Sequence, residues 1–264
     1  MIVSSWQRRI HRAQELVSQY PFTSELLGFY IYIAGFHEKL HQEFSGSWEK
    51  ATRSSAEKLA DREPGEMKSR FGDFLVLVEK HGTTQLIEFS RQLSDAGVQS
   101  WSELLSRAWK MQSPVALEEY VALLFLQPYL EWLRQGVPAQ LGSSTTTLCP
   151  FCGRKPGLGV LRPMGEGTAR SLVCFLCLNE WEFRRLACPS CGEENSEKLA
   201  IYTADELNYI RLDCCDACKT YLKTVDLSKN GAASPWIDEM ASAPLDLWAA
   251  ERGYQKLQKN LLGM

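Results

Sequence analysis

Cysteines carry the strongest chemical signal in this 264-residue chain. All nine lie between residues 149 and 218, and eight of them form four pairs with two residues between the thiols. The pairs are Cys149 with Cys152, Cys174 with Cys177, Cys188 with Cys191, and Cys215 with Cys218. This spacing lets both sulfurs of a tight turn point at one centre, and two such turns supply the four ligands of a tetrahedral ion. The eight cysteines therefore predict two metal ions, and both iron and zinc suit four thiolates.

The distances between the pairs favour one grouping. The gap between the first and second pairs is 21 residues and that between the third and fourth is 23, whereas only ten residues separate the second pair from the third. We therefore expect two tandem modules, 149–187 and 188–226, each holding one ion. A cross-braced arrangement, first pair with third and second with fourth, stays open because spacing does not fix connectivity. We take Cys215 as the ligand in the last pair, although its neighbour Cys214 could replace it.

Other uses of cysteine fit the pattern less well. Disulfides need an oxidising compartment, redox CxxC chemistry normally uses one pair beside a βαβ pattern, and buried cysteines without a ligand would not fall into four equal spacings. The sequence shows no secretory signal and no run of about 18 apolar residues, the length that a membrane span needs. We therefore expect metal ligation in a cytoplasmic protein that does not insert into a membrane.

The part of the chain before the cysteines has the pattern of a helical domain. Apolar residues recur at helical spacing from residue 4 to residue 136, and Ser4-x-x-Gln7 has the form of a capping box. We expect the polar stretch 45–64 to mix loop with a short helix. A long apolar helix should begin at Ser113-Pro114 and kink or break at Pro128, where the ring removes a hydrogen bond.

From residue 149 the sequence changes to short β-prone runs bounded by turn residues. Strands are expected at 158–161, 171–173, 181–186, 199–202, 209–212 and 221–225. Helix should resume at Ser234-Pro235 and continue over 244–262. The predicted fold is α+β and multidomain: an all-α domain over 1–140, two tandem four-cysteine modules of the zinc-ribbon kind within 141–230, and a C-terminal helical segment over 231–264.

A second candidate metal site lies in the helical part. The run from His37 to His41 matches H-E-x-x-H, in which two imidazoles on one helix face bind zinc, and Glu38 stands where the general base of a zinc protease would be. The chain has only two other histidines, and no third ligand is apparent. We therefore interpret the run as an ordinary helix face.

The charge pattern does not favour nucleic acid as a partner. The formal net charge is −3, and residues 149–226 hold ten Lys and Arg against eleven Asp and Glu. Eight thiolates around two divalent ions would make this region more negative, whereas a module that binds phosphate needs the opposite sign. A zinc-ribbon protein that binds nucleic acid remains as an alternative hypothesis only.

The sequence resembles the FdhE-type formate dehydrogenase accessory proteins. The resemblance covers most of the chain and is specific from Cys149 onward, where four cysteine pairs occur in the family's order. The other residues that carry it are Gly153 and Gly192 directly after two pairs, Glu180-Trp181, Tyr221-Leu222-Lys223, Leu245-Asp246-Leu247 and Glu251-Arg252-Gly253. The additional Cys214 departs from the family pattern.

The resemblance implies an all-α N-terminal domain and two rubredoxin-like metal modules, with which iron is associated and which zinc fits equally well. It also implies a cytoplasmic maturation factor that binds the catalytic subunit of a respiratory formate dehydrogenase, is needed for its activity and is not an enzyme. Four thiolates around an ion leave no open position for a substrate, so we assign no catalytic and no cofactor-binding residues. The alternative is a rubredoxin-like one-electron carrier or redox sensor that acts on the same partner.

Overall fold

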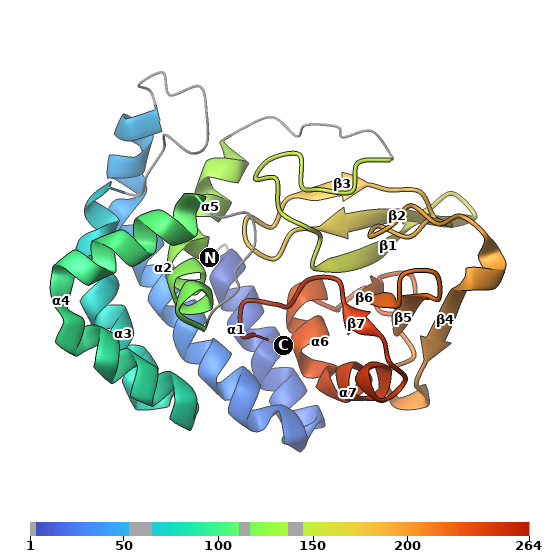
Figure 1. The fold of residues 1–264 in the computed structure, drawn as a ribbon, viewed down its shortest axis with the longest axis horizontal. Coiled ribbons are helices and arrows are strands. Elements are labelled where there is room, and N and C mark those ends of the chain that lie inside the picture. Colours follow the sequence, from blue (N-terminus) through green and yellow to red (C-terminus); the bar gives the residue numbers. More distant parts are fainter. Residues whose placement is uncertain (1–3, 53–64, 111–116, 137–144, 264) are drawn as a thin grey trace. The chain divides into compact units, whose positions relative to one another are not determined.

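The computed structural model describes residues 4–52, 65–110, 117–136 and 145–263 (Figure 1). Contacts divide the chain into two compact units, Met1–Gly136 and Val137–Met264. The first unit is helical, and the second holds a mixed β-sheet followed by short helices. The predicted α+β class is confirmed, while the domain limits at residues 140 and 230 stay predictions.

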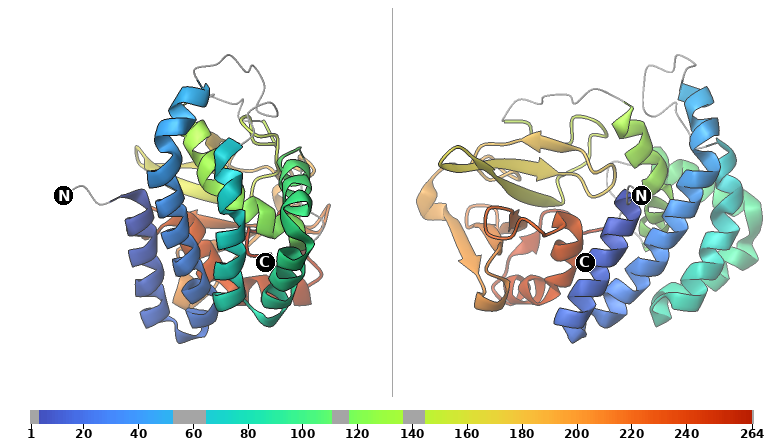
Figure 2. Two further views of the ribbon diagram at one scale, coloured as in Figure 1. Left: turned by 90° about the vertical axis from the view of Figure 1, so that its left-hand side faces the viewer. Right: turned by 180° about the vertical axis from the view of Figure 1, so that it is seen from behind.

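Long helices make up the described part of the first unit. They are α1 (Ser5–Gln19), α2 (Ser24–Thr52), α3 (Phe71–His81), α4 (Thr84–Lys110) and α5 (Leu117–Gln135). Helix α1 packs along α2, and α5 contacts both α2 and α4 (Figures 1 and 2). Phe71, Phe74 and Phe125 are fully buried, and the ring of Phe125 lies 5.0 Å from that of Phe71 and 5.5 Å from that of Phe74. Each such ring stabilises the unit by about 1.5–3 kcal/mol through burial.

Several helix ends follow the local sequence. The Ser4 hydroxyl accepts a hydrogen bond from the Gln7 amide at 3.0 Å and caps α1 as predicted. Gly97 has a φ of 78° and interrupts the helical path of α4. A positive φ of this kind is strained for any residue with a β-carbon, which explains why the helical path changes here.

Two further predictions for the helical unit are tested in part. Helix α2 continues through Ser45 to Thr52, so this part of the stretch expected to mix loop with a short helix is helical. An amphipathic helix tolerates polar residues on its exposed side while Phe44 stays buried. Helix α5 does not break at Pro128, since it runs on to Gln135, while the kink that was the other expectation stays a prediction. Burial along most of α5 compensates for the hydrogen bond that the proline ring removes. Residues 53–64 and the expected cap at Ser113-Pro114 lie outside the described residues.

One sheet runs through the second unit. Its strands are β1 (Leu158–Met164), β2 (Gly167–Val173), β3 (Glu180–Glu182), β4 (Leu199–Thr203), β5 (Ile210–Cys215), β6 (Thr220–Asp226) and β7 (Gln255–Lys256). The order is β3-β2-β1-β6-β5-β4, and β7 pairs with β6. All neighbours are antiparallel except β1 with β6 and β6 with β7. The parallel β1–β6 pair joins the two cysteine modules into one sheet.

A glycine makes this junction possible. A β-carbon built on Gly159 of β1 would lie 2.3 Å from Oγ1 of Thr224, its register partner on β6. Glycine at this position leaves the room that the Thr224 side chain occupies.

Two expectations for the second unit need correction. Strand β3 ends at Glu182 rather than at residue 186, because the chain must leave the sheet to form the turn at Cys188. The expected helix over 244–262 ends at Glu251. Gly253, with a φ of 78°, turns the chain so that Gln255 and Lys256 form β7 beside β6.

A buried charge network fastens the C-terminal elements to the sheet. Lys223 of β6 lies 2.8 Å from Glu239 of α6 (Pro235–Ala241) and 2.7 Å from Asp246 of α7 (Ala243–Glu251). Lys256 of β7 pairs with the same two carboxylates. Figure 1 shows α6 and α7 beside these strands. Because Lys223 and Glu239 are fully buried, the network is costly to break once formed.

Candidate metal centres

The first cysteine cluster contains Cys149, Cys152, Cys174 and Cys177, whose sulfurs all lie within 4.8 Å of one another. The sulfur of Cys149 is 3.6 Å from that of Cys177, and the sulfur of Cys152 is 3.5 Å from that of Cys174. Metal–sulfur bonds of about 2.3 Å in a tetrahedron require sulfurs about 3.8 Å apart. A disulfide would need about 2.05 Å. The four thiols therefore fit one metal ion and no disulfide.

The second cluster contains Cys188, Cys191, Cys215 and Cys218, again within 4.8 Å of one another. The sulfur of Cys188 is 3.7 Å from that of Cys218, and the sulfur of Cys191 is 3.7 Å from that of Cys215. The structure thus groups the first pair with the second and the third with the fourth. The cross-braced alternative is not what the fold forms.

Each pair sits on the same kind of turn. The amides of Gly153, Leu178 and Gly192, each directly after a pair, donate to the carbonyl of that pair's first cysteine at 2.8, 3.1 and 3.0 Å. Residues 153, 178, 192 and 219 all have a positive φ, between 55° and 79°. Two of them, Leu178 and Lys219, carry a β-carbon, and this conformation costs such residues about 1–2 kcal/mol. The same strained turn occurs four times because each pair must direct its two sulfurs at one centre.

The sequence singled out the glycines at 153 and 192 but gave no comparable signal at Leu178. The signal that could have found it is its position directly after Cys177. In this turn the position matters more than the residue type.

Four thiols this close cannot all ionise without a cation. Hydrogen bonds from Cys149, Cys174 and Cys177 lower the pKa of Cys152 well below its ordinary value, whereas burial raises the pKa of Cys177. These opposite shifts arise because one thiolate is stabilised by neighbours that stay protonated. A divalent ion removes the conflict, since it binds four thiolates and releases their protons. The donor set therefore fits a metal such as zinc or iron.

The two clusters differ in exposure. In the first cluster only Cys152 is partly exposed, whereas in the second Cys191 is exposed and Cys218 is partly so. Burial opposes ionisation of Cys218, but hydrogen bonds from Thr220 outweigh it and lower the pKa of Cys218 to about 6. An ion in the second cluster would be the more accessible of the two.

Cys214 is not part of either cluster. It lies on β5 next to Cys215, pairs in register with Tyr221, and is buried. Because side chains alternate along a strand, Cys214 points to the opposite face of the sheet from Cys215. Burial, together with the charges of Asp213 and Asp216, raises the pKa of Cys214 to about 12. Cys215 is therefore the cluster member.

The H-E-x-x-H run forms no metal site among the described residues. His37 is fully buried with its ring edge-on to Trp6 at 5.4 Å, and burial lowers its pKa to about 3. Glu38 accepts hydrogen bonds from Ser4, at 2.7 Å, and from Gln7. His41 lines a cavity of about 180 Å³ together with Glu38. The run is a helix face, as interpreted from the sequence.

Comparison with known proteins identifies the family. Residues 148–185 match the model of the FdhE central domain, and residues 186–262 match that of the FdhE C-terminal domain. An FdhE homologue from Aquifex aeolicus is 27% identical over 96% of this chain and 94% of its own length. The cysteine-bearing part of the chain, residues 148–262, matches the FdhE family. The predicted resemblance is therefore confirmed.

Two further matches, one of sequence and one of structure, are to FdhE from Pseudomonas aeruginosa. An FdhE homologue from this organism is 31% identical over 67% of this chain and 59% of its own length. The crystal structure of the FdhE protein from Pseudomonas aeruginosa superposes with a TM-score of 0.64 at 23% identity, over 97% of this chain and 94% of that one. The chain therefore shares its fold with that protein. Among the described helices, none combines the length and the apolar character needed to cross a membrane.

Proposed function

We propose that this chain is a cytoplasmic accessory factor that binds the catalytic subunit of a respiratory formate dehydrogenase and is required for the activity of that enzyme. The single observation that carries the proposal is the pair of closed four-thiol clusters on a sheet of the FdhE family. In this proposal each cluster holds one iron or zinc ion, and the chain catalyses no reaction itself.

The chemistry of the clusters supports a binding role over a catalytic one. Four protein ligands complete a tetrahedral sphere and leave no position for substrate or water. The eight cysteines of the two clusters would hold the ions, and the ions would stabilise the small modules, because ligation energy adds to folding energy. In this proposal the helical domain over 1–140 precedes the metal modules in the sequence, and the C-terminal segment over 231–264 follows them.

A pull-down tests the binding role. Tagged chain should retain the catalytic subunit of a formate dehydrogenase from a bacterial lysate. Cys174→Ser, which removes one ligand of the first cluster, should lose one ion and weaken retention. Cys214→Ala is the matched control, because this thiol lies outside both clusters, and it should keep two ions and full retention. Failure of the unmodified chain to retain the subunit under both reducing and oxidising conditions refutes the proposal.

One observation favours the second candidate, a one-electron carrier or redox sensor. Cys191 leaves one side of the second cluster exposed, and four-thiolate iron supplies one-electron chemistry where zinc supplies none. Metal analysis with an absorption spectrum of protein made at native levels separates the two. Colourless protein that holds only zinc eliminates the redox role.

The third candidate, binding of nucleic acid, has less support. The Arg184-Arg185 doublet is partly neutralised because Arg184 pairs with Glu194. A salt-sensitive gel shift with DNA or RNA would be needed to revive it.

A further inference from the structure

Strand β4 is an unprotected edge of the sheet. It is last in the strand order, and within the described residues it pairs only with β5. Its sequence, Leu-Ala-Ile-Tyr-Thr, contains no charge and no proline, although natural edge strands usually carry such residues to prevent pairing with other chains. Ile201 is 51% exposed and Tyr202 is 37% exposed. An edge with free backbone groups and exposed apolar side chains is suited to accept another strand.

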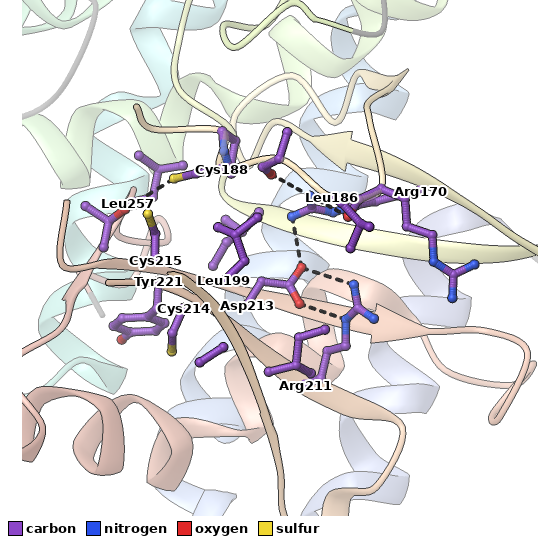
Figure 3. Close-up of a pocket in the computed structure, with 17 residues that line it drawn as sticks. Arg170, Leu186, Cys188, Leu199, Arg211, Asp213, Cys214, Cys215, Tyr221 and Leu257 are labelled. Carbon is purple, nitrogen blue, oxygen red and sulfur yellow. Dashed lines mark hydrogen bonds and ion pairs between the residues drawn. The ribbon is translucent and has the colours of Figure 1, made fainter. Parts of the chain in front are cut away.

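An apolar pocket lies beside this edge (Figure 3). Leu199 and Ile201 of β4 line it together with Leu186, which is 58% exposed, and Leu222 of β6. The pocket volume is about 30 Å³. Since about 10–15 Å³ holds one water molecule, the pocket has room for the end of one short aliphatic side chain.

One end of the pocket is rich in arginine. Asp213 is shared by two guanidinium groups: its Oδ2 lies 2.9 Å from Nη2 of Arg170, and its Oδ1 lies 2.7 Å from Nε of Arg211. Arg170 is held further by the Ala187 carbonyl, to which it donates at 2.9 Å. Arg185, on the exposed surface, also lines the pocket. Two guanidinium groups thus pair with one carboxylate, and the third arginine, Arg185, lies beside the pocket on the exposed surface.

The opposite end of the pocket is formed by the thiols of the second cluster. Figure 3 shows Cys188 and Cys215 at one end and Arg211 at the other. In register, Leu199 stands opposite Cys215 and Thr203 stands opposite Arg211. The pocket is therefore apolar in the middle and positive near Thr203.

We propose that β4 accepts an additional strand from the partner polypeptide, and that this strand carries an aliphatic residue followed two positions later by a carboxylate. Residues two apart on a strand share a face, so in a strand that runs parallel to β4 the aliphatic side chain enters the pocket beside Ile201 and the carboxylate, near Thr203, meets Arg185 and Arg211. A second copy of this chain fits less well, because β4 has no carboxylate to offer. The inference rests on the proposed function, in which the partner is the formate dehydrogenase catalytic subunit.

Two defined peptides test the site directly. The full, metal-loaded chain is titrated with acetyl-Thr-Thr-Val-Thr-Glu-Thr-Thr-amide and with the same peptide carrying lysine in place of glutamate, and backbone amide shifts are followed by NMR. The glutamate peptide should shift amides of residues 199–203 and bind at least tenfold more tightly than the lysine peptide. Arg185→Glu should reverse this preference. Within the part of the chain that the structure describes, its side chain donates only to the Thr168 carbonyl, at 3.3 Å, so the fold should tolerate the change.

The outcomes separate this inference from the proposed function. Equal binding of the two peptides, or shifts away from β4, overturns the inference. The same amides shifting with protein concentration alone, as the chain dimerises, also overturns it in favour of a second copy. In the complex with the catalytic subunit, amides of residues 199–203 should be protected from hydrogen exchange, and a complex that leaves them unprotected refutes the docking site. If the unmodified chain does not bind the catalytic subunit, the proposed function fails, and the peptides still decide whether β4 binds acidic strands.

Discussion

Replacing Glu239 by glutamine tests whether the buried charge network holds the C-terminal elements on the sheet. Glu239 is fully buried, pairs with both Lys223 and Lys256, and accepts a hydrogen bond from Asn260 at 3.1 Å. Glutamine keeps the shape of the side chain but removes its charge. The two ammonium groups would then share only Asp246, so the variant leaves buried positive charge without compensation.

The expected loss can be worked out from the titration of this group. Burial acts to raise the pKa of Glu239, but the charges of Lys223 and Lys256 outweigh it and lower the pKa from 4.5 to about 2. One pKa unit corresponds to about 1.4 kcal/mol, so the charge of Glu239 contributes about 3 kcal/mol. Removal of one partner of a buried ion pair typically costs about 3–5 kcal/mol. Both routes predict a loss of about 3 kcal/mol, a large share of the roughly 5–15 kcal/mol that stabilises a domain.

Hydrogen exchange of the β6 amides measures the free energy of opening in the second unit. At pH 7, Glu239→Gln should lower it by about 3 kcal/mol, whereas the exposed control Glu251→Gln should change it by less than about 0.5 kcal/mol. A difference below about 1 kcal/mol in the free energy of opening between Glu239→Gln and the unmodified chain would show that the buried charge does not stabilise the C-terminal elements.

The pH dependence gives a second check. Because the folded pKa of Glu239 lies below its unfolded value, its contribution is present above pH 4.5 and is lost as the pH falls toward 2. The difference in the free energy of opening between the variant and the unmodified chain should therefore become smaller in acid. Acid also protonates the cysteine ligands of both proteins. The quantity to compare between pH values is therefore the difference between the two free energies of opening, not either free energy alone. A difference that is the same at pH 7 and pH 3 would refute the assignment.

Three other predictions concern the clusters, a glycine and a histidine. Because Cys191 is exposed and the first cluster is largely buried, a chelator should remove the two ions in two phases. Cys191→Ser should abolish the fast phase, and Cys174→Ser should abolish the slow phase. A single phase of metal release from the unmodified chain contradicts this prediction. A β-carbon on Gly157 would lie 1.8 Å from the ring of buried Phe175, so Gly157→Ala should lower the free energy of unfolding by about 1–3 kcal/mol in urea. Its control Gly35→Ala, in a helix with nothing within 4 Å, should raise it by about 0.5–1 kcal/mol. Burial lowers the pKa of His37 from 6.5 to about 3, so its imidazole NMR signal should not titrate between pH 5 and pH 8. The helical unit should lose stability as the pH falls below 6.5. A titration midpoint of the His37 signal near pH 6.5 would show that the ring is accessible.

Local signals predicted much of the helical unit, and tertiary packing explains where they failed. The cap at Ser4 and the interruption at Gly97 depend on the backbone within a few residues, so the sequence contains the whole cause. Pro128 has an equally clear local preference, yet α5 continues through it because most of its residues are buried. The single hydrogen bond that proline removes is a small term beside that burial.

Contacts with the rest of the second unit also determine the path of the C-terminal segment. Residues 252–262 share the apolar spacing of a helix, but the left-handed turn at Gly253 and the pairing of β7 with β6 take the chain elsewhere. The ion pairs of Lys256 with Glu239 and Asp246 stabilise this path. None of these partners is near Lys256 in the sequence, so no local pattern could have predicted them.

What the sequence by itself determined is the chemistry: eight cysteines are spaced for tight turns, and their sulfur atoms suit an ion such as zinc or iron. Which pairs meet, which of Cys214 and Cys215 faces the cluster, and how the two modules join were decided by the tertiary structure. The physical reason is that a two-residue spacing is a local constraint, whereas strand register and the parallel β1–β6 pair depend on contacts between residues far apart in the chain. The arginine-rich pocket beside β4 arises in the same way, because its walls come from β2, β4, β5 and β6 and meet only in the folded sheet.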